Sequence, residues 1–298
     1  MSGRLPLALV AAALLLLPAG VAGQCLPNAV PEDPDNPCRI DFPRWTGHVA
    51  AAGANAALHG LAAGVWAAVQ GRDFSQAFTV GAAGGVLVYG GKAMAGQRWD
   101  GAGLLGRQVA AMGTSLSRNA ADGVGALDRL VFPVGLGRLY VTPHAARPVR
   151  FRVDAMALGW TVYGIVEEEV TLAWDASLSA GTPVFLTDGK LLDREAGAHA
   201  AGVTQSGVVF AADIPVLGSA FLDRALAHER AHVVQHDQIF GLFTDPAEDW
   251  VLRRTPGLAR LEPWLDVNLG AQLLQALGYV FPEWADRPWE LEATFMAR

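Results

Sequence analysis

Charged residues are scarce in this chain of 298 residues, and no basic patch stands out among them. Charged residues make up 17% of the sequence and hydrophobic residues 52%, and the formal net charge is −7. Proteins that bind nucleic acid carry clustered lysine and arginine side chains that neutralise phosphate groups. We therefore expect no nucleic-acid partner.

Cysteine is nearly absent as well, with only Cys25 and Cys38 in the chain. No histidine lies close to either residue in sequence, which argues against a zinc site built on these two thiols. The residues between them, 26–37, are rich in proline and acidic side chains and have few features of regular structure. If the chain enters an oxidising compartment, a disulfide bond between Cys25 and Cys38 is the simplest pairing, within a proline-rich loop over 24–46.

The first 23 residues have the features of an export signal. Arg4 precedes an apolar run over 5–17, and the small residues of 21–23 suit a signal peptidase that cleaves before Gln24. The apolar run is too short to span a bilayer comfortably. We predict export to the periplasm, the cell envelope or the extracellular space. Lipidation of Cys25 is the weaker alternative, because Gln24 stands where a lipoprotein signal has a small residue.

Two long stretches almost without charge follow the proline-rich loop. Residues 49–70 carry no charge and residues 78–94 carry only Lys92. The short polar connection Gly71-Arg72-Asp73 between them predicts an antiparallel helical hairpin, within a Gly/Ala-rich region over 47–121.

Small residues recur in these stretches at a spacing of four, as in Gly60/Gly64, and this spacing lets helix backbones approach closely. Two interpretations are open. Residues 49–94 associate with a membrane, since each run is near spanning length, or they form tightly packed helices in a soluble domain. The next segment, 101–117, carries Arg107 and is more easily interpreted as an ordinary packed or interfacial helix.

The pattern changes to strand-like alternation over 122–215. Turn signals such as those at 175–177 and 188–190 separate the segments, and we predict a mostly antiparallel β-sheet or a sandwich-like meander. The segments with strand character are 138–142, 149–153, 161–166, 169–174, 182–187 and 207–211.

The sequence His228-Glu229-Arg230-Ala231-His232 carries the clearest chemical signal. Residues four apart lie on one face of a helix, so His228 and His232 can bind one metal ion, with Glu229 beside them as a proton acceptor. This pattern resembles the HExxH zinc metallopeptidases of the zincin group, and Gln235 makes it similar to bacterial HExxH-x-x-Gln domains. The alternative is a surface helix with two solvated histidines. The resemblance covers about the last quarter of the chain, and no family resemblance is found for 47–215.

The third metal ligand distinguishes the zincin subclasses. One subclass continues to a third histidine, but Gln238 stands at that position here. His236 lies eight residues after His228, roughly 12 Å further along a helix axis, and is too far away to share the ion. The resemblance is therefore to the glutamate-zincins, in which a later helix supplies a glutamate.

That glutamate often lies in a Glu-x-x-Ala-Asp pattern, and residues 290–294 match it except that Thr294 replaces the aspartate. The missing acid commonly orients a ligand histidine. The resemblance implies Glu290 as the third zinc ligand. Glu292 is the alternate, Glu248 and Glu262 are more distant candidates, and Tyr279 is a candidate phenol for stabilising an oxyanion.

Together these features predict an α+β fold with Gly/Ala-rich N-terminal helices, a central sheet and C-terminal zincin-like helices over 216–298. The resemblance implies an exported zinc-dependent metallopeptidase that cleaves peptide or protein substrates, with Glu229 as general base. It also implies an edge strand beside the HExxH helix that binds substrate backbone. The alternative is a non-catalytic, membrane-associated envelope protein whose zincin-like part is structural or degenerate.

Overall fold

The computed structural model describes residues 44–167, 170–187, 201–213, 218–245, 255, 258–261, 263–268 and 288–297. Several predictions from the sequence lie outside the described residues. They are the signal peptide over 1–23, the Cys25–Cys38 disulfide bond, the turn at 188–190, and the candidates Glu248, Glu262 and Tyr279.

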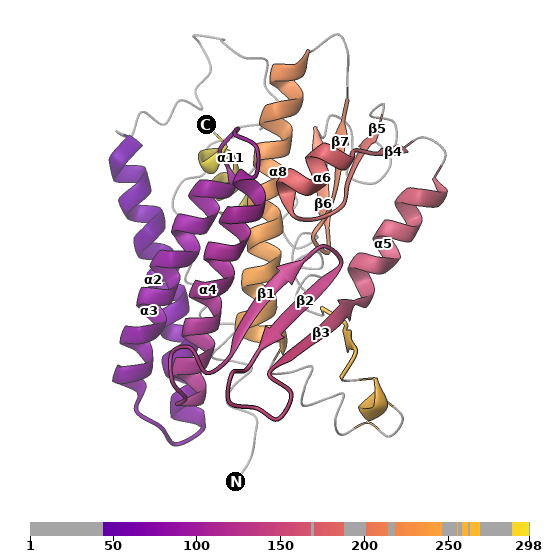
Figure 1. Cartoon of the computed structure of the whole chain (residues 1–298). Helices are drawn as coiled ribbons and strands as arrows, with labels where there is room; N and C mark the ends of the chain where they lie inside the picture. The colour runs from indigo at the N-terminus through magenta and orange to yellow at the C-terminus, as the bar shows by residue number, and fades with distance from the viewer. Residues whose placement is uncertain are drawn as a thin grey trace.

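Three long helices form the N-terminal part of the described fold (Figure 1). They are α2 (Arg44–Val69), α3 (Phe74–Ala95) and α4 (Ala102–Asp122). Asp73 begins α3, because its side chain accepts a 2.7 Å hydrogen bond from the backbone amide of Gln76. The predicted Gly/Ala-rich N-terminal helices are therefore confirmed, and α4 joins them as a third packed helix.

Glycine residues lie where these helices touch. A Cβ atom at Gly85 would lie 2.2 Å from the carbonyl oxygen of Asn55, and one at Gly91 would lie 2.5 Å from that of Gly106. Such distances are shorter than van der Waals contact, so only glycine allows the backbones to approach this closely. The small residues of this region therefore serve contacts between helices of the bundle.

One helix in the described part of the chain, Trp45–Val69, is long and apolar enough to cross a membrane. Within its most apolar 18-residue window, 28% of the residues are buried. A single helix of this kind is weak evidence for a span, because core helices of soluble proteins share its length and composition.

The described strands form two four-stranded sheets. The first, in spatial order, contains β1 (Leu130–Val134), β2 (Gly137–Val141), β3 (Val149–Asp154) and β8 (Leu265–Asp266). The second contains β4 (Val170–Leu172), β5 (Val184–Thr187), β7 (Val208–Ala212) and β6 (Gly202–Gln205). Each sheet is mixed, since β3 pairs with β8 and β5 with β7 in parallel, whereas the other pairs are antiparallel. The α+β class is confirmed.

The strand predicted at 161–166 is wrong, because these residues belong to helix α5 (Ala155–Val166). Asp154 accepts hydrogen bonds of 3.0 Å from two backbone amides at the start of this helix, which caps it directly after β3. Its inward face is small: Ala157, Thr161 and Gly164. The predicted turn at 175–177 is likewise helical, within α6 (Trp174–Ala180).

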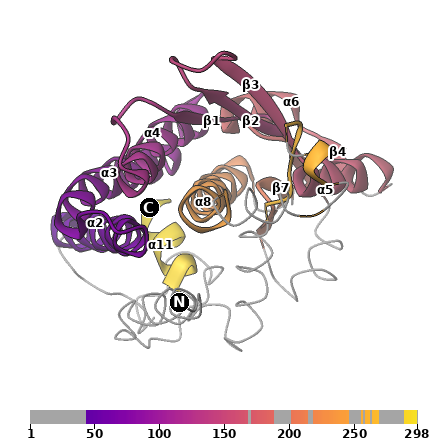
Figure 2. The ribbon, with the colours of Figure 1, turned by 90° about the horizontal axis from the view of Figure 1, so that it is seen from below.

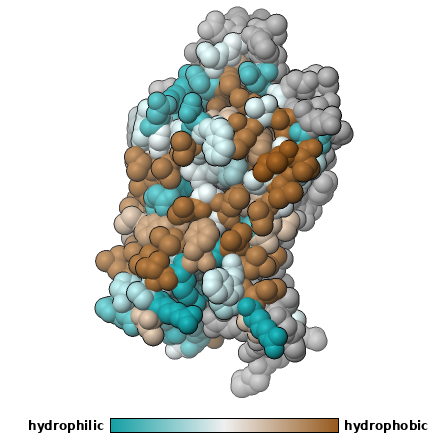
Figure 3. All heavy atoms as spheres, turned by 45° about the vertical axis from the view of Figure 1, so that its right-hand side comes forward, coloured by the Kyte–Doolittle hydropathy of each residue, from teal (hydrophilic) through white to brown (hydrophobic). Residues whose placement is uncertain are grey.

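The outward face of α5 is apolar, and hydrophobic side chains recur over this side of the molecule (Figure 3). The β-branched residues of 161–166 suited a strand, but the buried residues of α5 recur at the three- to four-residue spacing of a helix. The exposed residues of this face are Leu158, Val162, Ile165 and Val166.

Helix α8 (Ser219–Ile239) lies in the middle of the fold and continues into a π-helical turn, η2 (Phe240–Thr244). Figure 2 shows α8 almost end-on, with the α2–α4 bundle on one side and the strands on the other. The C-terminal helix α11 (Pro288–Met296) packs beside it, and a short 3-10 helix, η3 (Leu258–Arg260), completes the described elements. The central position of α8 places its histidines where bundle, sheet and C-terminal helix meet.

Candidate metal centre

Helix α8 and helix α11 bring together three residues that could hold a metal ion: His228, His232 and Glu290. The Nε2 atoms of the two histidines are 3.0 Å apart, and Oε2 of Glu290 lies 3.1 Å from each of them. The side chain of Glu290 is 4% exposed, that of His232 9% and that of His228 16%. The three residues that the resemblance implied as ligands therefore converge.

These residues fit a tetrahedral metal such as zinc. With bonds of about 2.0–2.1 Å, two ligand atoms of a tetrahedral site lie about 3.3 Å apart, close to the spacing seen here. When deprotonated, the Nε2 atoms of His228 and His232 each offer a lone pair, as does Oε2 of Glu290, and a shared cation satisfies all three at once. Two histidines and one glutamate form a donor set of catalytic zinc sites, which leave a fourth position open.

The charges around the site favour a cation. Burial opposes ionisation of Glu290, but His232 and His228 outweigh burial and hold the pKa of Glu290 well below its ordinary value. Burial likewise lowers the pKa of His232, whereas Glu290 raises it, and the net result is a pKa of about 9. An anionic Glu290 therefore attracts positive charge to the Nε2 atoms beside it.

Glu229 lies next to the three residues and is held by the second sheet. Thr204 of β6 donates a 2.8 Å hydrogen bond to Oε2 of Glu229. A Cβ atom at Gly202 would lie 2.7 Å from Cγ of Glu229, so a glycine there lets β6 pack directly on the side chain. Burial raises the pKa of Glu229, although the two histidines and Thr204 oppose that shift. A buried carboxyl group with a raised pKa is suited to take up and release a proton.

Gln235 orients His232, a role that the sequence pattern would have given to an aspartate at the position of Thr294. Oε1 of Gln235 lies 2.8 Å from Nδ1 of His232, and Nε2 of Gln235 donates a 2.8 Å hydrogen bond to Glu292. Glu292, the alternate ligand, does not belong to the cluster, because its carboxylate binds Gln235, Lys92 and Asn55 instead.

The polar contacts continue from Glu292 into the helical bundle. The amide of Gln238 lies 3.4 Å from Oδ1 of Asn55 and 3.0 Å from Nε2 of His59, whose Nδ1 is 2.8 Å from the hydroxyl group of Ser117. One signal in the sequence pointed to this chain of contacts, namely a single charged residue, Lys92, in an otherwise uncharged stretch.

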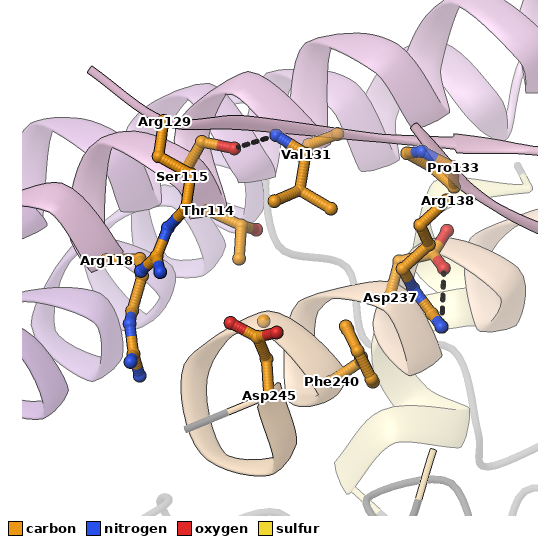
Figure 4. Close-up of a pocket in the computed structure, with 12 residues that line it drawn as sticks. Thr114, Ser115, Arg118, Arg129, Val131, Pro133, Arg138, Asp237, Phe240 and Asp245 are labelled. Carbon is orange, nitrogen blue, oxygen red and sulfur yellow. Dashed lines mark hydrogen bonds and ion pairs between the residues drawn. The ribbon is translucent and has the colours of Figure 1, made fainter. Parts of the chain in front are cut away.

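The opposite side of α8 is anchored by ion pairs around a small cavity between α4, β1 and the end of α8 (Figure 4). Asp237 faces Arg138 of β2 at 3.8 Å and also pairs with Arg107 of α4. The other arginines at the cavity, Arg118 and Arg129, pair with Asp122. This cavity is lined by paired charges and lies apart from the histidines, so we assign it a structural role.

No known family model, curated protein or solved structure matches this chain. The assignment of the site therefore depends on its own geometry. That geometry defines a buried cluster of two histidines and one glutamate that could hold a metal ion.

Proposed function

We propose that this chain is an exported zinc-dependent metallopeptidase of the glutamate-zincin type. The observation that carries the proposal is the convergence of His228 and His232 with Glu290, which lies 62 positions after His228. A helix carrying two solvated histidines would require neither a buried carboxylate between them nor the second helix that supplies it.

The residues divide the chemistry between them. His228, His232 and Glu290 would hold zinc, whose Lewis acidity lowers the pKa of bound water to about 7 and polarises a carbonyl group. The carboxylate of Glu229 takes a proton from the attacking water and delivers it to the leaving amine. Thr204 holds the carboxylate of Glu229 for both transfers.

The position of the sheet beside α8 supports the proposal that the substrate is a peptide. In the described part of the second sheet, β6 is the last strand after β7, and its Thr204 contacts α8 at Glu229. An extended peptide that pairs with such a strand would pass close to the metal ligands. Export, proposed from the signal-like residues 1–23, would place the substrate in the cell envelope or outside the cell.

Metal analysis of the purified chain tests the proposal. We expect one equivalent of zinc in the wild type and loss of zinc in His228→Ala. His144→Ala, which removes an exposed histidine on a loop, is the matched control and should retain the metal. A wild type without zinc, or a His228→Ala variant with a full equivalent, would show that the proposal is wrong.

Hydrolysis is tested with a proteome-derived peptide library analysed by mass spectrometry. Glu229→Gln should abolish cleavage and keep zinc, whereas Glu167→Gln, at the end of α5, should leave both unchanged. Cleavage that continues in Glu229→Gln, or no cleavage by the wild type with zinc bound, would contradict a peptidase.

The exposed apolar side chains of the bundle favour a second candidate, the non-catalytic membrane-associated protein. They include Val49, Leu61, Val69, Phe74, Val86 and Leu87. Under this proposal the wild type floats with phospholipid vesicles, and Val49→Ser combined with Val86→Ser reduces flotation. Failure of the wild type to bind vesicles would contradict it, independently of the metal result.

A further inference from the structure

The amide of Gln235 can take only one orientation. Glu292 is ionised in its ion pair with Lys92, and a carboxylate can only accept hydrogen bonds, so the NH2 group of Gln235 must face it. Oε1 of Gln235 then faces Nδ1 of His232, 2.8 Å away. An amide oxygen also only accepts, so Nδ1 of His232 must carry the proton.

This proton position decides which nitrogen of His232 is free to bind a metal. In a neutral imidazole one nitrogen carries hydrogen and the other carries a lone pair. With Nδ1 protonated, the lone pair is on Nε2, and Nε2 is the atom 3.1 Å from Glu290 and 3.0 Å from His228. The contact with Gln235 therefore prepares His232 for metal binding.

Lys92 holds the far end of the chain of contacts that runs from His232 through Gln235 to Glu292, which we call the relay. Its Nζ donates hydrogen bonds of 2.8 Å to Glu292 and 2.9 Å to Oδ1 of Asn55, and the residue is 2% exposed. Asn55 in turn donates a 2.8 Å hydrogen bond to the other carboxylate oxygen of Glu292. Both oxygens of Glu292 are thus engaged from α2 and α3, and Glu292 cannot turn away from Gln235 without losing buried partners.

We propose that Lys92 is a positioning residue for the metal centre, acting through Glu292 and Gln235 on the tautomer and orientation of His232. This inference rests on the proposed metal function and extends it, because it makes the Gly-rich helical bundle part of the metal site. A structural role alone predicts something different: Lys92 would hold α11 against the bundle and would affect stability without affecting His232.

Two readouts separate these roles in the purified full-length protein. The first is the 15N NMR spectrum of the metal-free protein labelled at histidine, recorded at a pH above the raised pKa of His232, where the neutral imidazole shows which nitrogen carries the proton. The wild type should show Nδ1 protonated, and Lys92→Met should show a mixture of tautomers. The signal of His232 is assigned from its absence in His232→Gln.

The second readout is zinc affinity, measured by competition with a chromophoric chelator. Lys92→Met should weaken zinc binding by about tenfold or more, the usual effect of removing a group that supports a ligand histidine. Gln235→Leu should weaken it to a similar extent, and adding Lys92→Met to Gln235→Leu should cause no further loss. Gln235→Leu leaves the ion pair intact, so it tests the relay even if Lys92→Met does not fold.

Arg107→Met is the matched control, because Arg107 also forms a buried ion pair between the bundle and α8 but does not contact Gln235. It should lower the melting temperature while changing zinc affinity less than about threefold. The proposal is overturned if Lys92→Met leaves the tautomer of His232 unchanged. It is also overturned if Lys92→Met weakens zinc binding to the same extent in the wild type and in Gln235→Leu. A wild type that binds no zinc but shows the Lys92-dependent tautomer would refute the peptidase and retain the relay.

Discussion

The hydroxyl group of Thr204 donates a 2.8 Å hydrogen bond to the carboxylate of Glu229, and its oxygen also lies 3.2 Å from the backbone carbonyl oxygen of that residue. Through this contact the second sheet holds the proposed general base, which also lies near His228 and His232. Glu229 is 4% exposed, so its position depends on β6 and not on solvent.

Thr204→Val should therefore separate metal binding from catalysis. Valine has nearly the shape of threonine but no hydroxyl group, so Glu229 loses its hydrogen bond while the proposed zinc ligands are untouched. We expect the rate of peptide cleavage to fall by about tenfold to a hundredfold, because small displacements of a catalytic group are costly. Zinc content should remain at one equivalent, and Thr204→Ser should restore the rate. Equal rates in wild type and Thr204→Val would show that the contact does not position Glu229.

Much of the metal site could be predicted from the sequence because its signal is local. The four-residue spacing of His228 and His232 is a property of one helix, and α8 preserves it. Glu290 followed from resemblance to a Glu-x-x-Ala-Asp pattern, from which Thr294 departs. In the structure Nδ1 of His232 is contacted by Gln235, a residue of its own helix.

The relay and the sheet arrangement could not be predicted, because both depend on residues far apart in the chain. Lys92 and Glu292 are 200 positions apart, and nothing near either residue indicates the other. Likewise β8 pairs with β3 across more than a hundred residues and so adds the fourth strand of the first sheet. In α5, the cap at Asp154 and the small inward face outweighed the strand propensity of its valines.

The two glutamates of α11 should respond differently to the same substitution. Glu290 contacts both ligand histidines, so Glu290→Gln should abolish stoichiometric zinc binding at micromolar zinc. Glu292 contacts Lys92 and Gln235, so Glu292→Gln should still bind one equivalent, with an affinity reduced by about 10–100-fold. Isothermal titration with zinc measures both quantities. The reverse order of effects would identify Glu292 as the ligand.

Neighbouring glycines in α3 should have opposite effects on stability. A Cβ atom at Gly91 would clash with the backbone of Gly106 at 2.5 Å, whereas one at Gly90 would meet nothing within 4 Å. Gly91→Ala should therefore destabilise the protein by about 1–3 kcal/mol through overpacking. Gly90→Ala should stabilise it by about 0.4–1 kcal/mol, because alanine restricts the unfolded chain and favours helix. Urea unfolding measures both. If both variants were equally destabilised, close packing of the bundle would not depend on Gly91.

The buried His59 should make the stability of the bundle depend on pH. Burial, and then the positive charge of Lys92, lower the pKa of His59 from 6.5 to about 3. Between these two values the unfolded chain binds a proton at His59 and the native protein does not. The stability that neutral His59 allows is therefore fully present above pH 6.5. As the pH falls from 6.5 toward 3, the free energy of unfolding decreases by at most about 1.4 kcal/mol per pH unit.

His59→Gln keeps hydrogen-bonding groups near Ser117 and Gln238 but cannot titrate. Between about pH 7 and pH 5.5, urea unfolding of the wild type should lose about 1 kcal/mol more than that of His59→Gln. Parallel losses in the two proteins would mean that His59 can be protonated in the native bundle, because water reaches it or Lys92 has moved away.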